Sequence, residues 1–288
     1  MEYILHLAII VSIFAILGVS LNLVVGFTGL LSLAHAAFYG VGAYASAILT
    51  RSYGWDFFPS VLVGIAVAMF AALLIGLVLS KFDGDYYALA SLGFSAIVYS
   101  LFLNWRGLTR GSLGLPGIPR PEIFGMSFSE REFFLILALL CLILVYAVSR
   151  WIERSSFGRV LKAIREDERA LRVFGYRTLL FKLAVFVMAS GMAAIAGALF
   201  ASYTRFIDPN VGLLMDSVLI LAMVILGGMA SLKGSIFGAL FLIVLPELMR
   251  FVGFPDLVAA ELRQITYGLI LILLMLYRPQ GLLGKYKL

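Results

Sequence analysis

The sequence predicts an all-α, polytopic integral membrane protein with about eight or nine transmembrane or half-membrane helices. Hydrophobic residues make up 62% of the 288 residues and charged residues only 13%, whereas about one quarter of a soluble domain is charged. The mean hydropathy is +1.05. Long runs without Asp, Glu, Lys or Arg recur along the whole chain, and an apolar helix of roughly 20 residues crosses a bilayer.

The first charge-free run is too long for one helix. It extends from Tyr3 to Thr50, and the sequence GFTG at residues 26–29 offers a turn near its middle. We therefore expect two spans, at about 3–25 and 30–50. No basic n-region and no small-residue cleavage site precede GFTG, so we expect a retained first helix and not a signal peptide.

Six further charge-poor runs predict the remaining spans. They are 57–80, 86–105, 133–149, 183–204, 217–246 and 264–277. The fifth of these is interrupted only by Lys233, next to Gly234, and is long enough for two helices. The glycine-rich runs are candidates for helices that break inside the membrane.

The segment from Arg150 to Lys182 carries most of the net charge. It holds nine basic and four acidic residues, a net charge of +5 in a chain whose formal charge is +6. By the positive-inside rule we expect this loop, at about 150–182, and the C-terminal RPQGLLGKYKL to be cytoplasmic. The loop at about 106–132, in which opposite charges nearly balance, is then external.

The basic loop is predicted to contain an amphipathic helix. Apolar residues recur there at helical spacing, at Phe157, Val160, Leu161, Ile164, Leu171 and Phe174. Ser155 or Ser156 suits the N-cap, and Gly175 suits a C-terminal cap. Three interpretations stay open: a docking helix for a cytoplasmic partner, an interfacial helix on anionic lipid, and nucleic-acid binding, which no other feature of the sequence supports.

The sequence lacks the motifs of the main catalytic and ion-coupled classes. The two histidines lie on different segments, and no P-loop is present, so the chain does not hydrolyse ATP unaided. Carboxylates are nearly missing from the spans, with Asp208, Asp216 and Glu247 at their borders. This argues against a stand-alone secondary transporter and against a channel with a charged selectivity ring. We expect no catalytic residue, metal site or cofactor on this chain.

Residues 29–49, GLLSLAHAAFYGVGAYASAIL, mix polar and small residues within an apolar span. Ser32, His35 and Tyr39 lie on one face of a helix because of their spacing, and they are candidate pathway-lining residues. Gly40 and Gly42 belong to a small-residue surface on which a neighbouring helix packs closely. The alternative for His35 is a hydrogen bond between helices with no contact to the substrate.

A later segment resembles this one and predicts an internal repeat. Gly29, Ser32, Leu33 and Phe38 recur, at a constant offset of 199, as Gly228, Ser231, Leu232 and Phe237. Transporters often contain such repeats, but four matches between glycine-rich helices also arise by chance. Gly227, Gly228 and Gly238 are further candidates for helix packing.

Five segments resemble the high-affinity branched-chain amino acid ABC permeases, and most closely their LivM-like branch. They are LNLVVGFTGLLSLAHAAFYGVGAYASAIL (21–49), TRGSLGLPGIPRP (109–121), SSFGRVLKAIREDERALRVFGYRTLLFKLAVFVMASGMAAIAGALFASY (155–203), VILGGMASLKGSIFGALFLIVLPELMR (224–250) and YRPQGLLG (277–284). The segments run in order over nearly the whole chain.

The resemblance implies one ABC-importer permease domain at 1–288 in a bacterial or archaeal cytoplasmic membrane. It implies a second, homologous permease subunit, two cytoplasmic ABC ATPases that bind ATP and magnesium, and an extracytoplasmic substrate-binding protein. The substrates would be amino acids, above all branched-chain ones, with urea, short amides and aromatic acids as alternatives. A secondary transporter, a membrane enzyme and a neutral-solute channel are the rivals from other classes.

The resemblance also implies that the helix in the basic loop couples ATP hydrolysis to the membrane domain. The candidate coupling residues are Gly158, Leu161, Ile164, Arg165, Glu168, Leu171 and Gly175. We expect the apolar face of this helix to fill a groove on an ATPase subunit. The importer pattern Glu-Ala-Ala-x-x-x-Gly is met loosely, because Arg169 replaces an alanine and the glycine comes one position late. Arg110 stands where the family's external loop would have a glycine.

Overall fold

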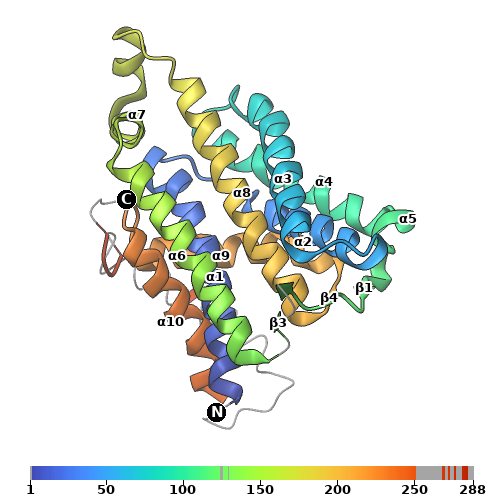
Figure 1. The fold of residues 1–288 in the computed structure, drawn as a ribbon. Coiled ribbons are helices and arrows are strands. Elements are labelled where there is room, and N and C mark those ends of the chain that lie inside the picture. Colours follow the sequence, from blue (N-terminus) through green and yellow to red (C-terminus); the bar gives the residue numbers. More distant parts are fainter. Residues whose placement is uncertain are drawn as a thin grey trace.

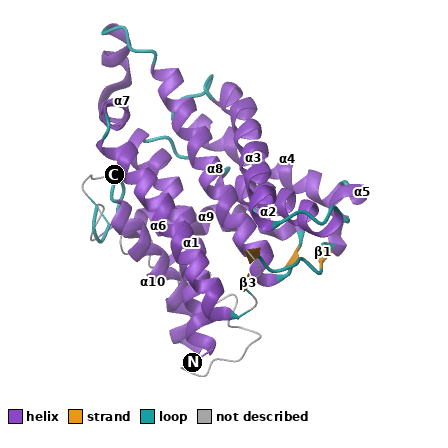
Figure 2. Ribbon diagram, in the orientation of Figure 1, coloured by secondary structure: helices purple, strands orange, loops and turns teal. Residues whose placement is uncertain are grey.

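The computed structural model describes residues 2–123, 126–128 and 130–250, together with 268, 269, 272, 276 and 281–284. This part of the chain is almost entirely helical, and its strands are two residues long (Figure 2). Helix α7 (Ser156–Val173) projects from one end of the bundle, and the N-terminus lies at the other (Figure 1). We call these the α7 end and the opposite end.

The remaining elements follow one another through the bundle. The helices are α1 (Glu2–Thr28), α2 (His35–Ser52), α3 (Phe57–Leu79), α4 (Asp85–Asn104), α5 (Arg106–Thr109), α6 (Arg131–Arg154), α8 (Thr178–Thr204), α9 (Leu214–Gly227) and α10 (Leu232–Arg250). The 3-10 turns are η1 (Gly111–Leu113) and η2 (Pro209–Gly212). Strand β1 (Leu115–Pro116) pairs antiparallel with β4 (Phe206–Ile207), and β2 (Glu122–Ile123) pairs with β3 (Met126–Ser127).

Most of the predicted spans correspond to apolar helices. Among the described residues, five helices are long and apolar enough to cross a membrane, namely α1, α3, α4, α6 and α8. The run at 217–246 forms two shorter apolar helices, α9 and α10. The run at 264–277 lies outside the described residues, apart from 268, 269, 272 and 276.

Helix α2 differs from the expected span at about 30–50. It begins only at His35, and residues 29–34 are not helical. The backbone of Leu33 is held by α4, because its N–H donates to Ser91 Oγ (2.9 Å) and its carbonyl accepts from Ser95 Oγ (2.8 Å). These hydrogen bonds replace the helical ones that residue 33 lacks, so a break inside the bundle is stable.

Helix α8 joins the two sides of the bundle. It packs on α1 on one side and on α2 and α3 on the other (Figure 1). At the α2 contact, a Cβ added to Gly42 would lie 2.3 Å from the Cα of Ala194. A Cβ added to Gly197 would lie 2.1 Å from the carbonyl oxygen of Tyr39. Glycine at these positions therefore lets the two backbones touch.

The other glycines predicted to serve helix packing also lie against neighbouring atoms. Gly40 faces the ring of Phe102 and the backbone of Gly212, Gly227 faces the backbone of Gly234, and Gly238 faces the carbonyl of Met223. Gly228 has a φ of +111° and touches the backbone of Gly284. An alanine at any of these positions would require the neighbour to move.

The segments of the predicted repeat occupy similar places. Gly29 follows α1 and Gly228 follows α9, and both have positive φ. Asn22 of α1 supports the second turn, since its Oδ1 accepts from the N–H of Ala230 (2.9 Å) and its Nδ2 donates to the carbonyl of Ser231 (3.0 Å). A single buried amide thus ties α1 to the α9–α10 turn.

Candidate functional site

Helix α7 lies across the end of α1. Its N-cap is Ser155, whose Oγ accepts from the N–H of Gly158 at 3.2 Å. Arg165 donates a hydrogen bond to the carbonyl of Gly26, and the Lys162 ammonium lies 5.3 Å from the centre of the Phe27 ring. Two basic side chains therefore fix α7 to the last turn of α1, where the helix dipole is negative.

The apolar face of α7 packs on its own chain. Leu161 and Ile164 are buried in the main core, Leu171 packs partly against it, and Gly158 lies against the carbonyls of Ile152 and Glu153. This differs from the expected groove on an ATPase. The apolar spacing predicts that one face of the helix is buried, but it does not identify the covering surface. In the structure, the ends of α1, α6 and α8 cover this face. A coupling role for the helix as a whole stays a prediction.

The last turns of α7 point away from the bundle. The helix is kinked at Asp167, which has φ −155° and ψ 96°. Asp167 Oδ1 accepts from the N–H of Ala170 at 3.0 Å and so caps a second, short helix. That helix ends in exposed Val173 and Phe174, followed by Gly175 with a φ of +84°. The resulting projection, residues 173–176, is here called the α7 tip.

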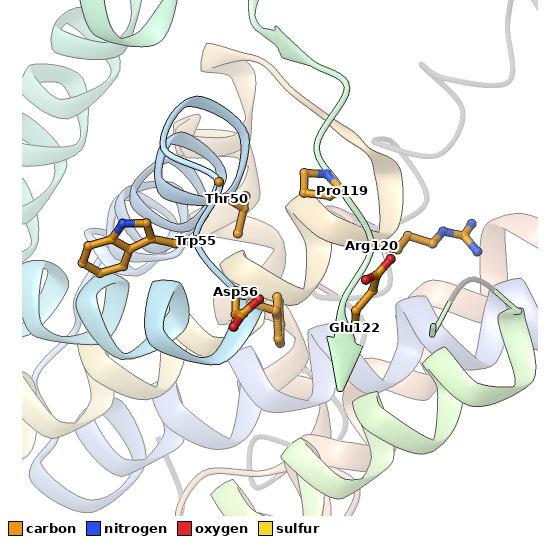
Figure 3. Close-up of a pocket in the computed structure, with 8 residues that line it drawn as sticks. Thr50, Trp55, Asp56, Pro119, Arg120 and Glu122 are labelled. Carbon is orange, nitrogen blue, oxygen red and sulfur yellow. The ribbon is translucent and has the colours of Figure 1, made fainter. Parts of the chain in front are cut away.

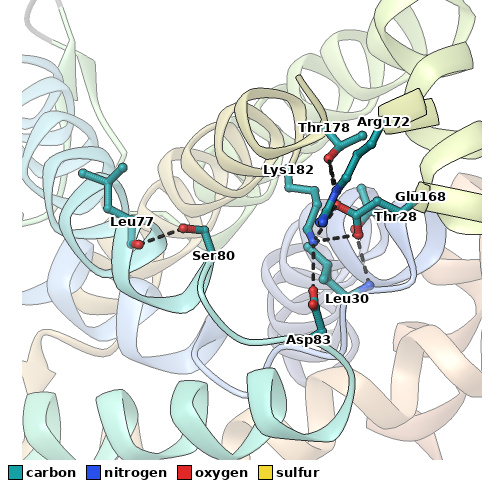
Figure 4. A network of polar contacts seen from close by, with 9 residues as sticks. All are labelled: Thr28, Leu30, Leu77, Ser80, Asp83, Glu168, Arg172, Thr178 and Lys182. Carbon is teal, nitrogen blue, oxygen red and sulfur yellow. Dashed lines mark hydrogen bonds and ion pairs between the residues drawn. The ribbon is translucent and has the colours of Figure 1, made fainter. Parts of the chain in front are cut away.

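A buried ammonium group holds this kinked part of α7 to α8 (Figure 4). Lys182 Nζ lies 3.0 Å from Glu168 Oε2 and 3.8 Å from Asp83 Oδ1. Glu168 Oε1 also accepts from Arg172 (2.7 Å) and from Thr178 Oγ1 (2.8 Å). We call these five residues the lysine joint. It links α7, the start of α8 and the turn between α3 and α4.

The lysine joint keeps Glu168 ionised. Burial raises the pKa of this carboxyl, but the hydrogen bonds from Arg172, Lys182 and Thr178 outweigh burial and hold the pKa below its ordinary value. Of these five residues, the sequence pattern had pointed to Glu168 alone, and Lys182, Arg172, Thr178 and Asp83 were not among the candidates. The available signal was Lys182 itself, the single charge at the start of an otherwise charge-free span.

The starts of α2 and α9 meet inside the bundle, at what we call the central break. The N–H of Ala36 donates to Ser217 Oγ at 3.1 Å. His35 Nε2 is 2.7 Å from Ser20 Oγ on α1. The first turns of two helices thus meet here, with their positive dipole ends directed at the same region.

The three candidate pathway residues are all buried within this single chain. Ser32 Oγ accepts from the N–H of Ala34 (3.4 Å), His35 pairs with Ser20, and the Tyr39 ring packs 5.7 Å from that of Phe200. They share the α2 region, but each has its own neighbours. His35 is placed as a hydrogen-bonding group between helices, and pathway lining by these residues stays a prediction.

A pocket of about 290 Å³ opens at the end opposite α7 (Figure 3). It lies between the α2–α3 turn and the loop that follows β1, and is lined by Thr50, Gly54, Trp55, Asp56, Phe57, Pro119, Arg120 and Glu122. Asp56 and Glu122 lie on opposite walls, and the Arg120 guanidinium points away from the pocket. Among the described residues, no group of three or more His, Cys, Asp or Glu is placed to hold a metal ion.

Comparison with known proteins covers nearly the whole chain. The family described as "Branched-chain amino acid transport system / permease component" matches residues 3–275. The chain is 36% identical to the high-affinity branched-chain amino acid transport system permease protein LivM of Escherichia coli (strain K12), over 96% of this chain and 69% of the relative.

Two further relatives are more distant. The chain is 26% identical to the permease protein LivH of the same E. coli strain, over 95% of this chain and 92% of LivH. It is 27% identical to the probable branched-chain amino acid transport permease protein LivM of Methanocaldococcus jannaschii, over 95% of this chain and 91% of the relative. No solved structure matches the chain. The chain therefore belongs to the family of permease components of branched-chain amino acid transport systems.

Proposed function

We propose that this chain is one permease subunit of an ATP-driven importer and forms part of the translocation pathway for branched-chain amino acids. The observation that carries the proposal is the match to the permease family over residues 3–275. The spans give the membrane domain, and the α7 end supplies a surface for the machinery that drives it. The chain itself carries no ATP site in this proposal.

The second permease subunit is a homologue of this chain. Relatives named LivM and LivH both match about 95% of it, at 36% and 26% identity. Two permeases named for the same high-affinity system therefore both resemble nearly the whole of this chain, which supports a heterodimer around a common pathway. Two ABC ATPases, which bind ATP and magnesium, and an extracytoplasmic binding protein complete the proposed importer.

We place the α7 end in the cytoplasm of a bacterial or archaeal cell. The basic segment at 150–182 lies there, and so do residues 281–284, because the N–H groups of Leu282 and Leu283 donate to the carbonyls of Leu226 and Gly227 (2.9 and 3.0 Å). The described part of the C-terminal segment thus lies at the same end as the basic segment at 150–182, which supports this placement under the positive-inside rule. The opposite end, with the pocket of Figure 3, then faces the binding protein.

The α7 tip is the surface proposed to dock an ATPase. Val173, Phe174 and Tyr176 are large, apolar and exposed beyond the membrane-spanning helices, and Arg169 and Arg177 flank them. Such a projecting apolar group with a charged rim fits a groove on a folded partner. An interfacial lipid helix is less suited, since the apolar face of α7 is already covered by its own chain.

The test compares two equally exposed apolar residues at opposite ends. Phe174 and Leu113 are each 79% exposed. Phe174→Glu should release the ATPase subunits from the purified complex while the two permeases stay paired, and Leu113→Glu should leave the ATPases bound. Subunit composition is measured by native mass spectrometry in detergent. Full retention of the ATPases by Phe174→Glu would refute docking at the α7 tip.

A further inference from the structure

Asp216 is a half-buried acidic residue beside the central break. It lies in the first turn of α9, next to Ser217, whose hydroxyl binds the start of α2 at the central break. His35, at the start of α2, lies 2.7 Å from Ser20 of α1, so the break is at the height of Ser20 along α1. Ser20 is 18 residues from the start of α1 and 8 from its end, which corresponds to about 27 Å and 12 Å along the helix.

Asp216 lies at the positive end of the α9 helix dipole but has no charged side-chain partner among the described residues. It is half-buried, and within the part of the chain that the structure describes it makes no salt bridge and no side-chain hydrogen bond. The groups that interact electrostatically with Asp216 are the Tyr39 hydroxyl and another acid, Asp208. Other charges at span borders are satisfied: Lys182 by Glu168, and Glu247 by the hydroxyl of Tyr3.

The surface around Asp216 combines apolar and polar side chains. On α9 the exposed neighbours Met215 and Val218 are apolar. Helix α4, which contacts α9, exposes Ser100 and Asn104 as well as Leu89, Ile97 and Leu101. A half-buried carboxylate is unfavourable against lipid and favourable against water or a cationic ligand. The carboxylate, more than the composition of the surface, assigns the α4–α9 face to the pathway.

We propose that Asp216 binds the ammonium group of the amino acid as it passes the central break. This rests on the proposed function and adds to it a specificity-determining residue. A carboxylate accepts charge-assisted hydrogen bonds from an ammonium donor and repels the carboxylate of the same zwitterion. Asp216 thus orients the amino acid with its ammonium end toward α9, and it discriminates against solutes of the same carbon skeleton that lack this group.

The test uses a cysteine reporter next to Asp216 in the assembled importer in proteoliposomes. Cys141 is first replaced by serine, and Met215→Cys, at an exposed neighbour of Asp216, supplies the thiol. Cationic and anionic thiosulfonate reagents of equal size are compared. Asp216→Asn should lower the ratio of cationic to anionic labelling rates roughly tenfold, whereas Asp216→Glu should keep it. Phe70→Cys on α3 is the control and should not react with either reagent.

Protection of the cysteine reporter from labelling shows which group of the solute interacts with Asp216. Leucine should slow labelling of the reporter in the Asp216 protein and much less in Asp216→Asn, and 4-methylpentanoate, which lacks the ammonium group, should not protect either. An unreactive reporter, an unchanged charge ratio in Asp216→Asn, or equal protection by the two solutes would each overturn the proposal. Neither measurement involves ATP or uptake, so its failure is distinguishable from failure of the importer function.

Discussion

Glu168 and Lys182 form the central ion pair of the lysine joint, and removing one should destabilise α7 more than removing the other. In Glu168→Gln the Lys182 ammonium stays buried, with its side chain 7% exposed, and its remaining charge partner is Asp83 at 3.8 Å, which is 76% exposed. In Lys182→Met the Glu168 side chain, 21% exposed, keeps Arg172 at 2.7 Å and Thr178 at 2.8 Å. The first change isolates a charge, and the second does not.

The expected free energies of destabilisation depend on whether a buried charge is left without its partner. Removing one partner of a buried pair destabilises by about 3–5 kcal/mol when the other charge is left alone. The exposed Asp83 offsets less than about 1 kcal/mol of this. The amide oxygen introduced by Glu168→Gln still accepts one hydrogen bond, so we expect about 2–3 kcal/mol for this variant. Lys182→Met loses the hydrogen bonds from Nζ to both carboxylate oxygens of Glu168 (3.2 and 3.0 Å). It also removes the buried charge and keeps the packed volume, so we expect about 1 kcal/mol.

Hydrogen exchange of the backbone amides that follow the kink in α7, residues 168–173, measures these values locally. The predicted difference of about 1.4 kcal/mol corresponds to a tenfold faster opening of this segment in Glu168→Gln than in Lys182→Met. Amides in α1 serve as an internal control and should not change. Equal opening in the two variants, or faster opening in Lys182→Met, would refute the reasoning.

Three further outcomes are expected. Because the pKa of Glu168 is held below its ordinary value, its stabilisation of α7 should be complete at neutral pH and lost as pH falls through that lowered pKa. Hydrogen exchange of α7 measured over a pH series tests this. The same loss of protection at acid pH in Glu168→Gln would contradict it. His35→Gln should keep assembly and part of leucine transport, since an amide still bonds the Ser20 hydroxyl; abolished transport in a normally assembled complex would favour direct contact with substrate. Gly42→Ala should destabilise the complex by about 1–3 kcal/mol by parting α2 from Ala194. Gly93→Ala, which has open space around it inside α4, should not lower the thermal midpoint, because alanine also favours the helix.

The spans could be predicted from the sequence because the length and hydrophobicity of a segment are local properties. A charge-free run of sufficient length favours a helix that can cross the membrane, and α1, α3, α4, α6 and α8 are helices of that length and composition. The late start of α2 was not predictable, since the break at 29–34 is stabilised by Ser91 and Ser95 from a different helix. Hydropathy carries no information about such a tertiary hydrogen bond.

The coupling region shows the same limit. The apolar spacing of Leu161 and Ile164 predicted a buried face, and that face is buried. The pattern did not reveal that the covering surface belongs to the same chain, so the exposed residues of the α7 tip were overlooked. Lys182 and Asp83 were missed because they lie 99 positions apart in the sequence and come together only in the folded chain.

Uptake of radiolabelled leucine into proteoliposomes tests the central claim most directly. The vesicles contain this chain with its homologous permease partner, the two ATPases and the binding protein. Accumulation should require ATP on the α7 side and all of these subunits, and it should stop when ATP is replaced by a non-hydrolysable analogue. Accumulation driven by an ion gradient without ATP, or equilibration of leucine through this chain alone, would contradict it.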